Sequence, residues 1–327
     1  MHSKKFTILV TGTSAITGYG VVASLRSCKY DCKIVGVAIY DDAIGKQWCD
    51  VFEVGVFALS AQFPKFIYDM IIKYDVDLVI PCVELEVNVL TKHRALYEGL
   101  DVKFVLNNLD VYAQLNDKSR TYWFLKNKVE QIPTLIGSNE LTYADISKKL
   151  GTPFILKKNI SSGSKGVVTI DEARDFDYWK YKFSDGYICQ KKIVGDEYTI
   201  AVFGTEEGHY VNMIAFWRRL GNGTTVQAKC ITADDGMVDY VNRICAVIRP
   251  IGPTNIQLIK EGSKYLLLEV NARISASTSI RTKFGVNEAE MCIEYFLLHK
   301  IPQKRKQKRG SAIRYLKDVI QYDSDNF

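Results

Sequence analysis

Short apolar runs alternate with longer amphipathic segments along the first third of the chain. The apolar runs predict strands, and segments that repeat apolar residues on one face predict helices. The predicted strands are Phe6–Val10, Lys33–Tyr40, Leu78–Ile80 and Lys103–Leu106. The predicted helices lie near Tyr19–Ser27, over Ala61–Tyr74 and from Glu84 to Tyr97. Strands that alternate with helices favour parallel βαβ units, so we expect a parallel α/β domain over residues 1–115.

The pattern changes after Asp117, where the strands become longer and more amphipathic. They are Pro153–Lys157, Val167–Ile170, Tyr187–Ile193, Tyr198–Phe203, Tyr210–Phe216, Thr225–Ile231 and Tyr265–Val270. Turn residues such as Asp185-Gly186 and Glu261-Gly262 separate them. This texture is typical of mostly antiparallel sheet with a few helices, so we expect an α+β arrangement after the first domain.

Composition narrows the class of protein. The 327 residues are 47% hydrophobic and 24% charged, which excludes a disordered chain, a collagen-like repeat and a disulfide miniprotein. The formal net charge is +6, and five basic residues gather in the run 304–309. The rest of the chain is near neutral, so we expect no nucleic-acid partner. The run itself we interpret as a solvated loop, with binding to an acidic partner as the alternative.

Neither the N-terminal segment nor the cysteines indicate export. No stretch approaches the roughly 18 to 20 consecutive apolar residues of a membrane-spanning helix. The apolar run Phe6–Val10 is too short for the core of a secretory signal. The eight cysteines include no CxxC pair, and no second pair or nearby His completes a zinc site around Cys28 and Cys32. We expect buried, reduced cysteines in a cytoplasmic protein without a membrane partner.

The segment Gly18-Tyr19-Gly20-Val21-Val22-Ala23 fits the dinucleotide-binding pattern G-x-G-x-x-A, and Asp41 and Asp42 follow about twenty residues later. The fingerprint has a tight turn directly after its strand, but here six residues, Gly12 to Thr17, intervene. The alternative interpretation is that the glycines let a helix pack closely on the sheet, and we favour it.

Four polar segments of the second half carry candidate chemistry. In the first, the strand Pro153–Lys157 delivers a lysine to the small-residue segment Ser161-Ser162-Gly163-Ser164-Lys165-Gly166. Small residues let backbone N–H groups approach phosphate oxygens, and lysine supplies positive charge. The spacing is not that of the Walker motif, and taken alone the segment reads as a polar hairpin turn.

The second segment runs from Gln190 to Tyr198, where a strand ends in a glycine turn and an acidic residue opens the next strand. The carboxylate of Glu197 suits ribose hydroxyls, and a strand backbone can read an adenine edge. An ordinary charged hairpin is the alternative.

The third segment is oxygen-rich. Glu269, Asn271 and Arg273 share one face if their strand stays extended, and Gln257 is expected opposite them across the Glu261-Gly262 turn. Oxygen ligands suit magnesium, which also takes phosphate oxygens and water. A plain solvent-facing surface is the alternative. The fourth segment, Asn116-Asp117-Lys118, lies where the alternating strand–helix pattern gives way to the longer amphipathic strands.

In this order the segments resemble the ATP-grasp superfamily. The stretch Asn271-Ala272-Arg273-Ile274-Ser275-Ala276-Ser277 with Lys283 and Gly285 is similar to the N-P-R-x-S-R-S pattern of the branch that contains the carbamoyl-phosphate-synthase large subunit. Val79-Ile80-Pro81, followed by Glu84 and Glu86, resembles the domain that precedes the ATP-grasp body in that family.

The resemblance implies a fold and a set of site residues. It implies a Rossmann-like domain over 1–115, a lid subdomain over 116–192 and a C-terminal antiparallel-sheet subdomain over 193–327. Lys118 and Lys157 would bind ATP phosphates beneath a loop of Ser161, Ser162, Gly163, Ser164 and Gly166. Gln190 and Glu197 would contact adenine and ribose, and Gln257, Glu269 and Asn271 would hold magnesium or manganese. Arg273 would steady the transferred phosphate, and with Lys157 it is the predicted catalytic pair.

The sequence departs from the family pattern at three places. The loop has only two glycines, Lys191 stands where an acidic residue is common, and Ala272 replaces the usual proline. We therefore expect ATP and magnesium as cofactors, with altered details in the adenine pocket.

The expected function is ATP-dependent ligation of a small carboxylic acid to an amine through an acyl phosphate. The chain holds one such module, whereas a complete carbamoyl phosphate synthase needs two. The alternatives are an ATP-binding phosphotransferase or subunit without ligation, a nicotinamide-dependent oxidoreductase and a non-enzymatic module. The sequence leaves the substrates and a homodimer open. Arg218 and Arg219 leave one strand on opposite faces, so only one can point toward the site.

Overall fold

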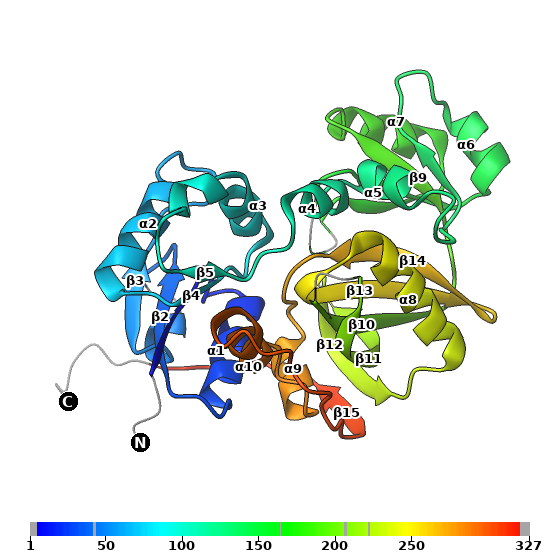
Figure 1. The fold of residues 1–327 in the computed structure, drawn as a ribbon. Helices are drawn as coiled ribbons and strands as arrows, with labels where there is room; N and C mark the ends of the chain where they lie inside the picture. The colour runs from blue at the N-terminus through cyan, green and yellow to red at the C-terminus, as the bar shows by residue number, and fades with distance from the viewer. Residues whose placement is uncertain are drawn as a thin grey trace.

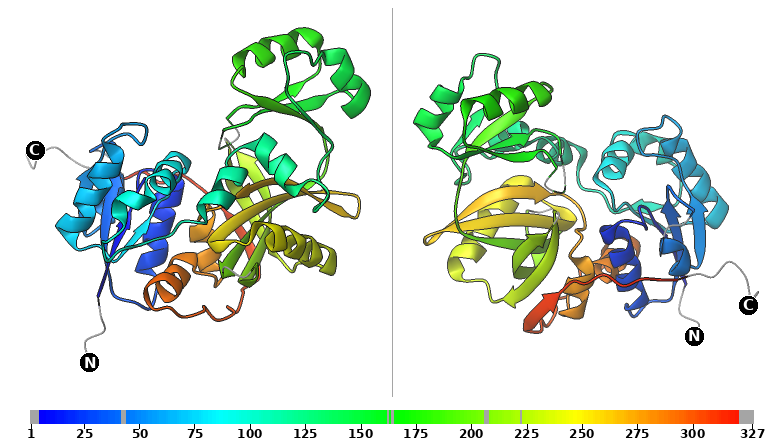
Figure 2. Two further views of the ribbon diagram at one scale, coloured as in Figure 1. Left: turned by 45° about the horizontal axis from the view of Figure 1, so that its top comes forward. Right: turned by 180° about the vertical axis from the view of Figure 1, so that it is seen from behind.

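A computed structural model describes residues 5–41, 44–161, 163, 165–205, 208–221 and 223–320 of this protein. Its strands form a five-stranded, a four-stranded and a six-stranded sheet. The five-stranded sheet lies apart from the other two, which stand one above the other (Figure 1). The two further views in Figure 2 show the same arrangement.

The N-terminal sheet is parallel, with strand order β3-β2-β1-β4-β5. Its strands are β1 (Phe6–Val10), β2 (Cys32–Ala38), β3 (Val51–Val54), β4 (Leu78–Ile80) and β5 (Lys103–Phe104). The connecting helices are α1 (Ile16–Arg26), α2 (Phe63–Tyr74) and α3 (Glu84–Lys92), with the short helices η1 (Ile44–Gln47) and η2 (Arg94–Tyr97). The predicted parallel βαβ arrangement is confirmed, although β3 was not predicted.

Both faces of this sheet are buried, because successive side chains of a strand point to opposite sides. Leu9 and Val79 pack with residues of α2 and α3 in one hydrophobic cluster. Ile8 and Ile80 pack in another cluster with α1 and with residues from the far end of the chain. The helices from that end are α9 (Thr278–Lys283), α10 (Glu288–Cys292) and the π-helix η3 (Ile293–Leu297). The C-terminal part of the chain therefore completes the core of the N-terminal sheet.

Two short helices, α4 (Leu109–Leu115) and α5 (Lys118–Leu125), lead to the four-stranded sheet. This sheet has the order β6-β9-β7-β8, and its pairs are antiparallel. Its strands are β6 (Thr134–Ile136), β7 (Phe154–Lys158), β8 (Val167–Ile170) and β9 (Tyr187–Lys191), with α6 (Tyr143–Leu150) and α7 (Ala173–Lys182). A separate hydrophobic cluster around Phe154 and Phe176 forms its core.

The six-stranded sheet is also antiparallel, in the order β14-β13-β10-β11-β12-β15. Its strands are β10 (Asp196–Thr205), β11 (Tyr210–Gly221), β12 (Thr224–Ile231), β13 (Ile251–Glu261), β14 (Lys264–Asn271) and β15 (Gly310–Ile313). Helix α8 (Asp235–Ile248) packs on β14. The antiparallel texture predicted for the second half of the chain is confirmed.

The basic run 304–309 departs in part from the solvated loop expected of it. Arg305 places its guanidinium 2.6 Å from a carboxylate oxygen of Glu294 and 3.2 Å from one of Glu290. Its backbone N–H also donates to the side-chain oxygen of Asn212 at 2.7 Å. The segment is therefore an ordered connection between η3 and β15, fixed at Arg305.

The glycines of the dinucleotide-like pattern lie inside α1 and do not form the turn after β1. A Cβ on Gly18 would come within 2.2 Å of the carbonyl oxygen of Gly12, and one on Gly20 within 3.2 Å of the Thr278 side chain in α9. The glycines therefore allow close packing, as favoured, but against the β1–α1 turn and α9. Asp42 lies outside the described residues.

The two domain boundaries of the prediction fall between sheets, one after α4 and the other between β9 and β10. The return of α9, α10 and η3 to the N-terminal sheet means that these boundaries do not separate independent cores. The division into three domains stays a prediction. Within the described part of the chain, no helix has the length and apolar character needed to cross a membrane.

Candidate functional site

A cavity of about 240 Å³ lies between the four-stranded and the six-stranded sheet. Eight of the predicted site residues line it: Lys118, Lys157, Ser161, Gly163, Gln190, Glu197, Gln257 and Glu269. Asn271 lies at its edge, in a small neighbouring pocket that shares Lys118, Ser161 and Glu269. Gly166 does not line the cavity, and its carbonyl instead accepts a hydrogen bond from the Lys158 N–H in the hairpin of β7 and β8. The predicted residues Ser162 and Ser164 lie outside the described residues.

Lys157 is buried in the cavity wall, with 9% of its surface exposed. Its ammonium group forms no hydrogen bond or ion pair with any residue that the structure describes. Burial lowers the pKa of Lys157 to about 8, and Lys118 adds to this effect while Glu269 and Glu197 oppose it. A buried cation without a fixed partner can bind an anion without first breaking an internal ion pair.

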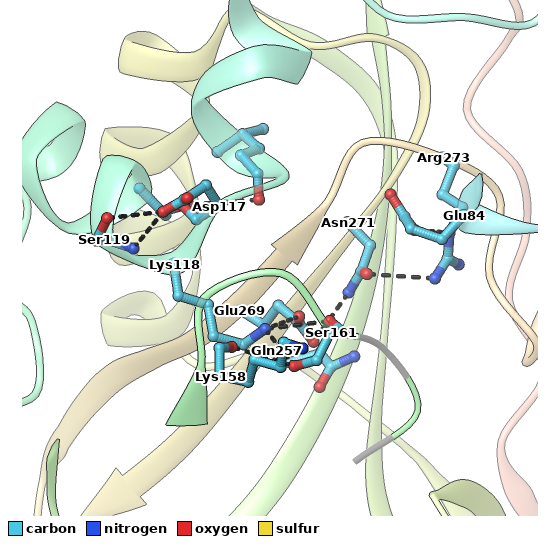
Figure 3. A network of polar contacts seen from close by, with 12 residues as sticks. Glu84, Asp117, Lys118, Ser119, Lys158, Ser161, Gln257, Glu269, Asn271 and Arg273 are labelled. Atoms are coloured by element: carbon cyan, nitrogen blue, oxygen red, sulfur yellow. Dashed lines mark hydrogen bonds and ion pairs between the residues drawn. The ribbon is translucent and has the colours of Figure 1, made fainter. Parts of the chain in front are cut away.

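Lys118 reaches the cavity from the opposite side, at the first turn of α5 (Figure 3). Asp117 begins this helix, and its carboxylate accepts from the N–H groups of Ser119 and Arg120, as a helix N-cap does. The ammonium group of Lys118 lies 3.1 Å from the Ser161 carbonyl and 3.6 Å from a Glu269 carboxylate oxygen. The cap therefore fixes the helix start that aims the lysine at the site.

Gln190 presents an unpaired oxygen to the same cavity. Its side-chain NH₂ donates to the Thr134 hydroxyl at 3.0 Å, which leaves its buried Oε1 without a partner among the described residues. A buried amide oxygen without a donor costs free energy, so this position favours a ligand that carries an N–H group. The exocyclic amine of adenine is such a group.

Arg218, not Arg219, points into the site. Arg219 is exposed, whereas Arg218 is buried and donates 2.8 Å to the Gln257 side-chain oxygen and 3.3 Å to a Glu197 carboxylate oxygen. The Nε of Arg218 is buried without a partner among the described residues. Burial lowers the pKa of this guanidinium, while Glu197 acts in the opposite direction. The residues predicted for ribose and metal are therefore joined by one arginine.

Gln257 lies directly opposite Glu269, so the predicted pairing across the Glu261-Gly262 turn is confirmed. The next pair is Leu258 with Leu267, which leaves Leu268 as an extra residue in β14. Such a β-bulge places two consecutive residues opposite one partner residue. Leu268 and Glu269 accordingly line the same cavity, although neighbours in a regular strand point to opposite faces.

Arg273 lies beyond the strand. The condition for Arg273 to share a face with Glu269 and Asn271 is not met, because β14 ends at Asn271. A tight turn follows, with the Arg273 N–H donating to the Asn271 carbonyl at 2.8 Å. The guanidinium still reaches the Asn271 side-chain oxygen at 3.3 Å, and Asn271 in turn lies 3.4 Å from Glu269 (Figure 3). It also forms an ion pair with Glu84 at the start of α3. Arg273 therefore links the N-terminal sheet to the site.

The apolar walls of the cavity were not predicted. They are formed by Ile132, Ile155, Val167, Ile193, Leu220, Ile259 and Leu268. Ile155 and Ile259 lie two residues from Lys157 and Gln257 on the same strands, so the two-residue period identifies them once those polar residues are known. Apolar walls with a few polar groups are typical of a small-molecule site.

The donor set fits magnesium only in part. No group of three or more His, Cys, Asp or Glu side chains that could hold a metal lies among the described residues. The predicted ligands comprise one carboxylate and two amides, and the Gln257 oxygen already accepts from Arg218. Glu269 and Asn271 remain as adjacent oxygen donors, a number that suits magnesium when phosphate oxygens complete its shell.

Comparison with known proteins identifies the fold. Residues 184–319 match the family described as ATP-grasp in the biosynthetic pathway with Ter operon. N5-carboxyaminoimidazole synthetase from Staphylococcus aureus, solved with ADP, is similar at a TM-score of 0.72 and 14% identity, over 94% of this chain and 82% of that chain. Biotin carboxylase from Campylobacter jejuni gives a TM-score of 0.70 at 15% identity, over 88% of this chain and 70% of that chain.

A third similar structure is L-amino acid ligase from Bacillus licheniformis, with a TM-score of 0.68 and 14% identity, over 91% of this chain and 75% of that chain. At these identities the likeness shows a shared fold, and the family match covers residues 184–319 only. Residues 184–319 therefore match an ATP-grasp family, and most of the chain shares its fold with these three structures.

Proposed function

We propose that this protein is an ATP-dependent ligase that joins a small carboxylic acid to an amine. The observation that carries the proposal is the buried, unpaired ammonium of Lys157 in a cavity that also holds Lys118 and Arg218. The lining of this cavity carries five cations against the two carboxylates Glu197 and Glu269, an excess that suits a polyanion such as a nucleotide triphosphate. The five are Lys118, Lys157, Lys191, Lys192 and Arg218. The similar structures are a synthetase, a carboxylase and an amino acid ligase, which supports the same class of chemistry.

The nucleotide would lie with its adenine between the apolar walls and its phosphates toward Lys157 and Lys118. The unpaired Oε1 of Gln190 would accept from the adenine amine, and Glu197 would accept from ribose hydroxyls. Glu269 and Asn271 would hold magnesium, which when bound neutralises charge on the phosphate oxygens. Arg218 would hold the side chains of Gln257 and Glu197 in place through its hydrogen bonds to both.

Two bond exchanges would follow. A carboxylate oxygen attacks the γ-phosphorus, so ADP leaves and an acyl phosphate forms. The amine nitrogen then attacks the carbonyl carbon, and inorganic phosphate leaves with the amide as product. Arg273 stands at the edge of the site, tied to Asn271 and Glu84, where it would offset the charge of the transferred phosphate. Most of the chemistry therefore requires positioning and charge compensation.

The acyl phosphate makes the proposal testable. A panel of carboxylic acids and amines is screened for ATP-dependent phosphate release, and the active acid is then incubated with hydroxylamine in place of the amine. Hydroxylamine is small enough to attack the acyl phosphate in a closed site, so a hydroxamate is expected by mass. Lys157→Ala should suppress it, whereas Lys92→Ala, an exposed lysine outside the site, should not.

Phosphate release that depends on acid and amine but never yields an amide or a hydroxamate would overturn the acyl-phosphate mechanism. Transfer of phosphate to a stable product would instead identify a phosphotransferase.

A further inference from the structure

A second cavity, of about 610 Å³, lies away from the nucleotide site, between the N-terminal sheet and the end of η3. One wall comes from η2 and β5 and includes Tyr97 and Phe104. The opposite wall comes from the start of β13 and from residues 295–301, and includes Ile251 and Phe296. The volume is in the range of about 300 to 1,000 Å³ that is usual for small-molecule sites, which favour such junctions between parts of a chain.

Aromatic rings form both walls of this cavity. The rings of Tyr97 and Phe104 lie with centroids 4.8 Å apart, and those of Tyr295 and Phe296 lie 5.1 Å apart. Both Tyr97 and Phe104 are buried, as is the neighbouring Leu106. Lining residues of both walls therefore carry aromatic rings, which favours a ligand with a flat apolar part, since aromatic groups stack or pack edge to face.

The rim of the cavity is basic. Arg94, Lys103 and Lys300 line it and are exposed, and Glu98 is the only carboxylate among its described lining residues. None of these basic side chains forms an ion pair with a described residue, whereas other exposed lysines such as Lys65 and Lys73 do. Unpaired cations around an apolar floor favour an anion whose charge stays at the mouth of the cavity.

The cavity is joined to the nucleotide site through Asn107. Leu106 and Ile251 line the cavity, and the buried side-chain oxygen of Asn107 accepts from the Ile251 N–H at 2.8 Å. The NH₂ group of the same side chain donates to the Ala272 carbonyl at 2.9 Å. Ala272 stands between Asn271 and Arg273 of the site. A displacement of Leu106 or Ile251 would therefore be passed directly to the turn that positions Arg273.

We propose that this cavity binds a small aromatic anion, a ring that bears a carboxylate, phosphate or sulfonate group, and that its occupancy is coupled to the nucleotide site through Asn107. The binding part of the proposal is independent of the proposed ligase activity. The coupling part rests on nucleotide binding at the Lys157 cavity, so the two parts are tested separately.

The binding test uses 8-anilinonaphthalene-1-sulfonate, an aromatic sulfonate whose fluorescence rises in apolar surroundings. It is titrated into the full chain with MgADP present, which keeps the probe out of the nucleotide cavity. The double variant Arg94→Glu/Lys103→Glu should raise the Kd of the probe at least about tenfold, because two attractive charges at the mouth become repulsive. Lys300→Glu, on the opposite wall, should raise it in the same direction.

The matched control is Lys92→Glu/Lys264→Glu, which changes the net charge equally at exposed positions outside the cavity. It should keep the wild-type Kd. Circular dichroism and thermal unfolding establish that each variant is folded. An unchanged Kd in both rim variants, or an equal rise in the control, would overturn the site.

The coupling test measures the MgADP affinity by calorimetry with and without the probe. Coupling is reciprocal, so a probe that alters Arg273 through Asn107 should change the MgADP affinity by at least about fivefold, the lower end of the usual range of such effects. The change should be absent in Arg94→Glu/Lys103→Glu. An equal change in the wild type and this variant would mean direct competition and would overturn the coupling. Absence of MgADP binding to the wild type would instead contradict the proposed function.

Discussion

At the residue scale, two opposing influences act on the protonation state of Lys157. Burial favours its neutral form, while the phosphates proposed to bind there favour its charged form. The pKa of about 8 in the free protein lies within reach of ordinary assay conditions. The protonation state of this one side chain should therefore govern nucleotide affinity.

We expect the Kd for MgATP to rise as the pH increases above 8, by up to about tenfold per pH unit, since the ammonium loses its proton there. Lys157→Arg should flatten this dependence, because arginine stays charged at these pH values. Calorimetric titrations between pH 7 and pH 9.5 measure both. A wild-type profile as flat as that of the variant would contradict the assignment of Lys157 to the phosphates.

Glu269 is the only carboxylate of the predicted metal ligands, next to Asn271 and opposite Gln257. Glu269→Gln removes the negative charge but keeps the size of the side chain, so it should lower turnover by about 10²-fold or more through loss of magnesium and phosphate positioning. A magnesium titration of activity checks the cause. Excess magnesium should recover part of the activity in this variant but none in Lys157→Ala. Wild-type activity at limiting magnesium would contradict this ligand.

Glu86 illustrates a buried carboxyl outside the site. It accepts from the Thr11 hydroxyl and the Val83 N–H, and burial raises its pKa to about 7. The folded state then binds the proton more tightly than the unfolded state. Ionisation of Glu86 therefore lowers the free energy of unfolding of the protein as the pH rises from about 4.5 through 7. Glu86→Gln should raise the free energy of unfolding at pH 8 by about 3 kcal/mol, and with it the unfolding temperature, but should give no gain at pH 5. Thermal scans at both pH values test it.

At the scale of elements, the strands were easier to predict than the helices. The strands β4 and β8 have the predicted bounds because a short apolar run is a local signal. Helix α8 is absent from the prediction although Met237, Val241 and Ile244 recur at helical spacing. The short helices α4 and α5 have no long periodic stretch, so they escaped detection for a physical reason.

The site was predictable to the extent that polar residues cluster near strand ends. Lys157, Gln190 and Glu269 meet in one cavity as the order of motifs indicated. The sequence could narrow the inward-pointing arginine only to Arg218 or Arg219, since the register of β11 decides which of the two side chains points inward. The ion pair of Arg273 with Glu84 joins segments that lie 189 residues apart in the sequence. Such a long-range contact leaves no local sequence pattern.

The glycine pattern of α1 gives a prediction about packing. Gly18→Ala should lower the free energy of unfolding by more than about 3 kcal/mol, because its Cβ would overlap a backbone carbonyl that cannot move freely. Gly20→Ala faces the end of the Thr278 side chain and should change stability by no more than about 1 kcal/mol, since the gain in helix propensity offsets the contact. Urea unfolding ranks the two. Equal effects would contradict the packing of α1, and NADH binding to the wild type would revive the dinucleotide interpretation.

At the scale of the whole molecule, the N-terminal sheet depends on the end of the chain. Its face with Ile8 and Ile80 is covered by residues of α10 and η3, among them Met291 and Ile293. Sequence alternation indicates a parallel sheet but says nothing of which helices complete it. The predicted boundary at residue 115 therefore cuts a shared core.

A fragment of residues 1–115 should fail to fold cooperatively, because it would expose the apolar face that α10 and η3 bury. In the full chain, the parallel sheet and the six-stranded sheet should unfold in one transition. Urea titrations followed by circular dichroism, with hydrogen exchange at individual amides, measure both. A fragment with its own cooperative transition, and with the stability of its sheet in the full chain, would show that the boundary separates an independent domain.

The extra residue in β14 makes the site sensitive to the length of this strand as well as to residue type. A change of Leu268 to another apolar residue would preserve the alignment of Gln257 with Glu269. Deletion of Leu268 would restore regular alternation of side chains along the hairpin. Either Glu269 or the preceding leucines of β14 would then point to the opposite face of the sheet. In a diverging lineage, substitutions here would therefore accumulate while single-codon deletions would be purged. Comparison of gene lengths across this hairpin would thus record selection on the site that residue identities alone would not reveal.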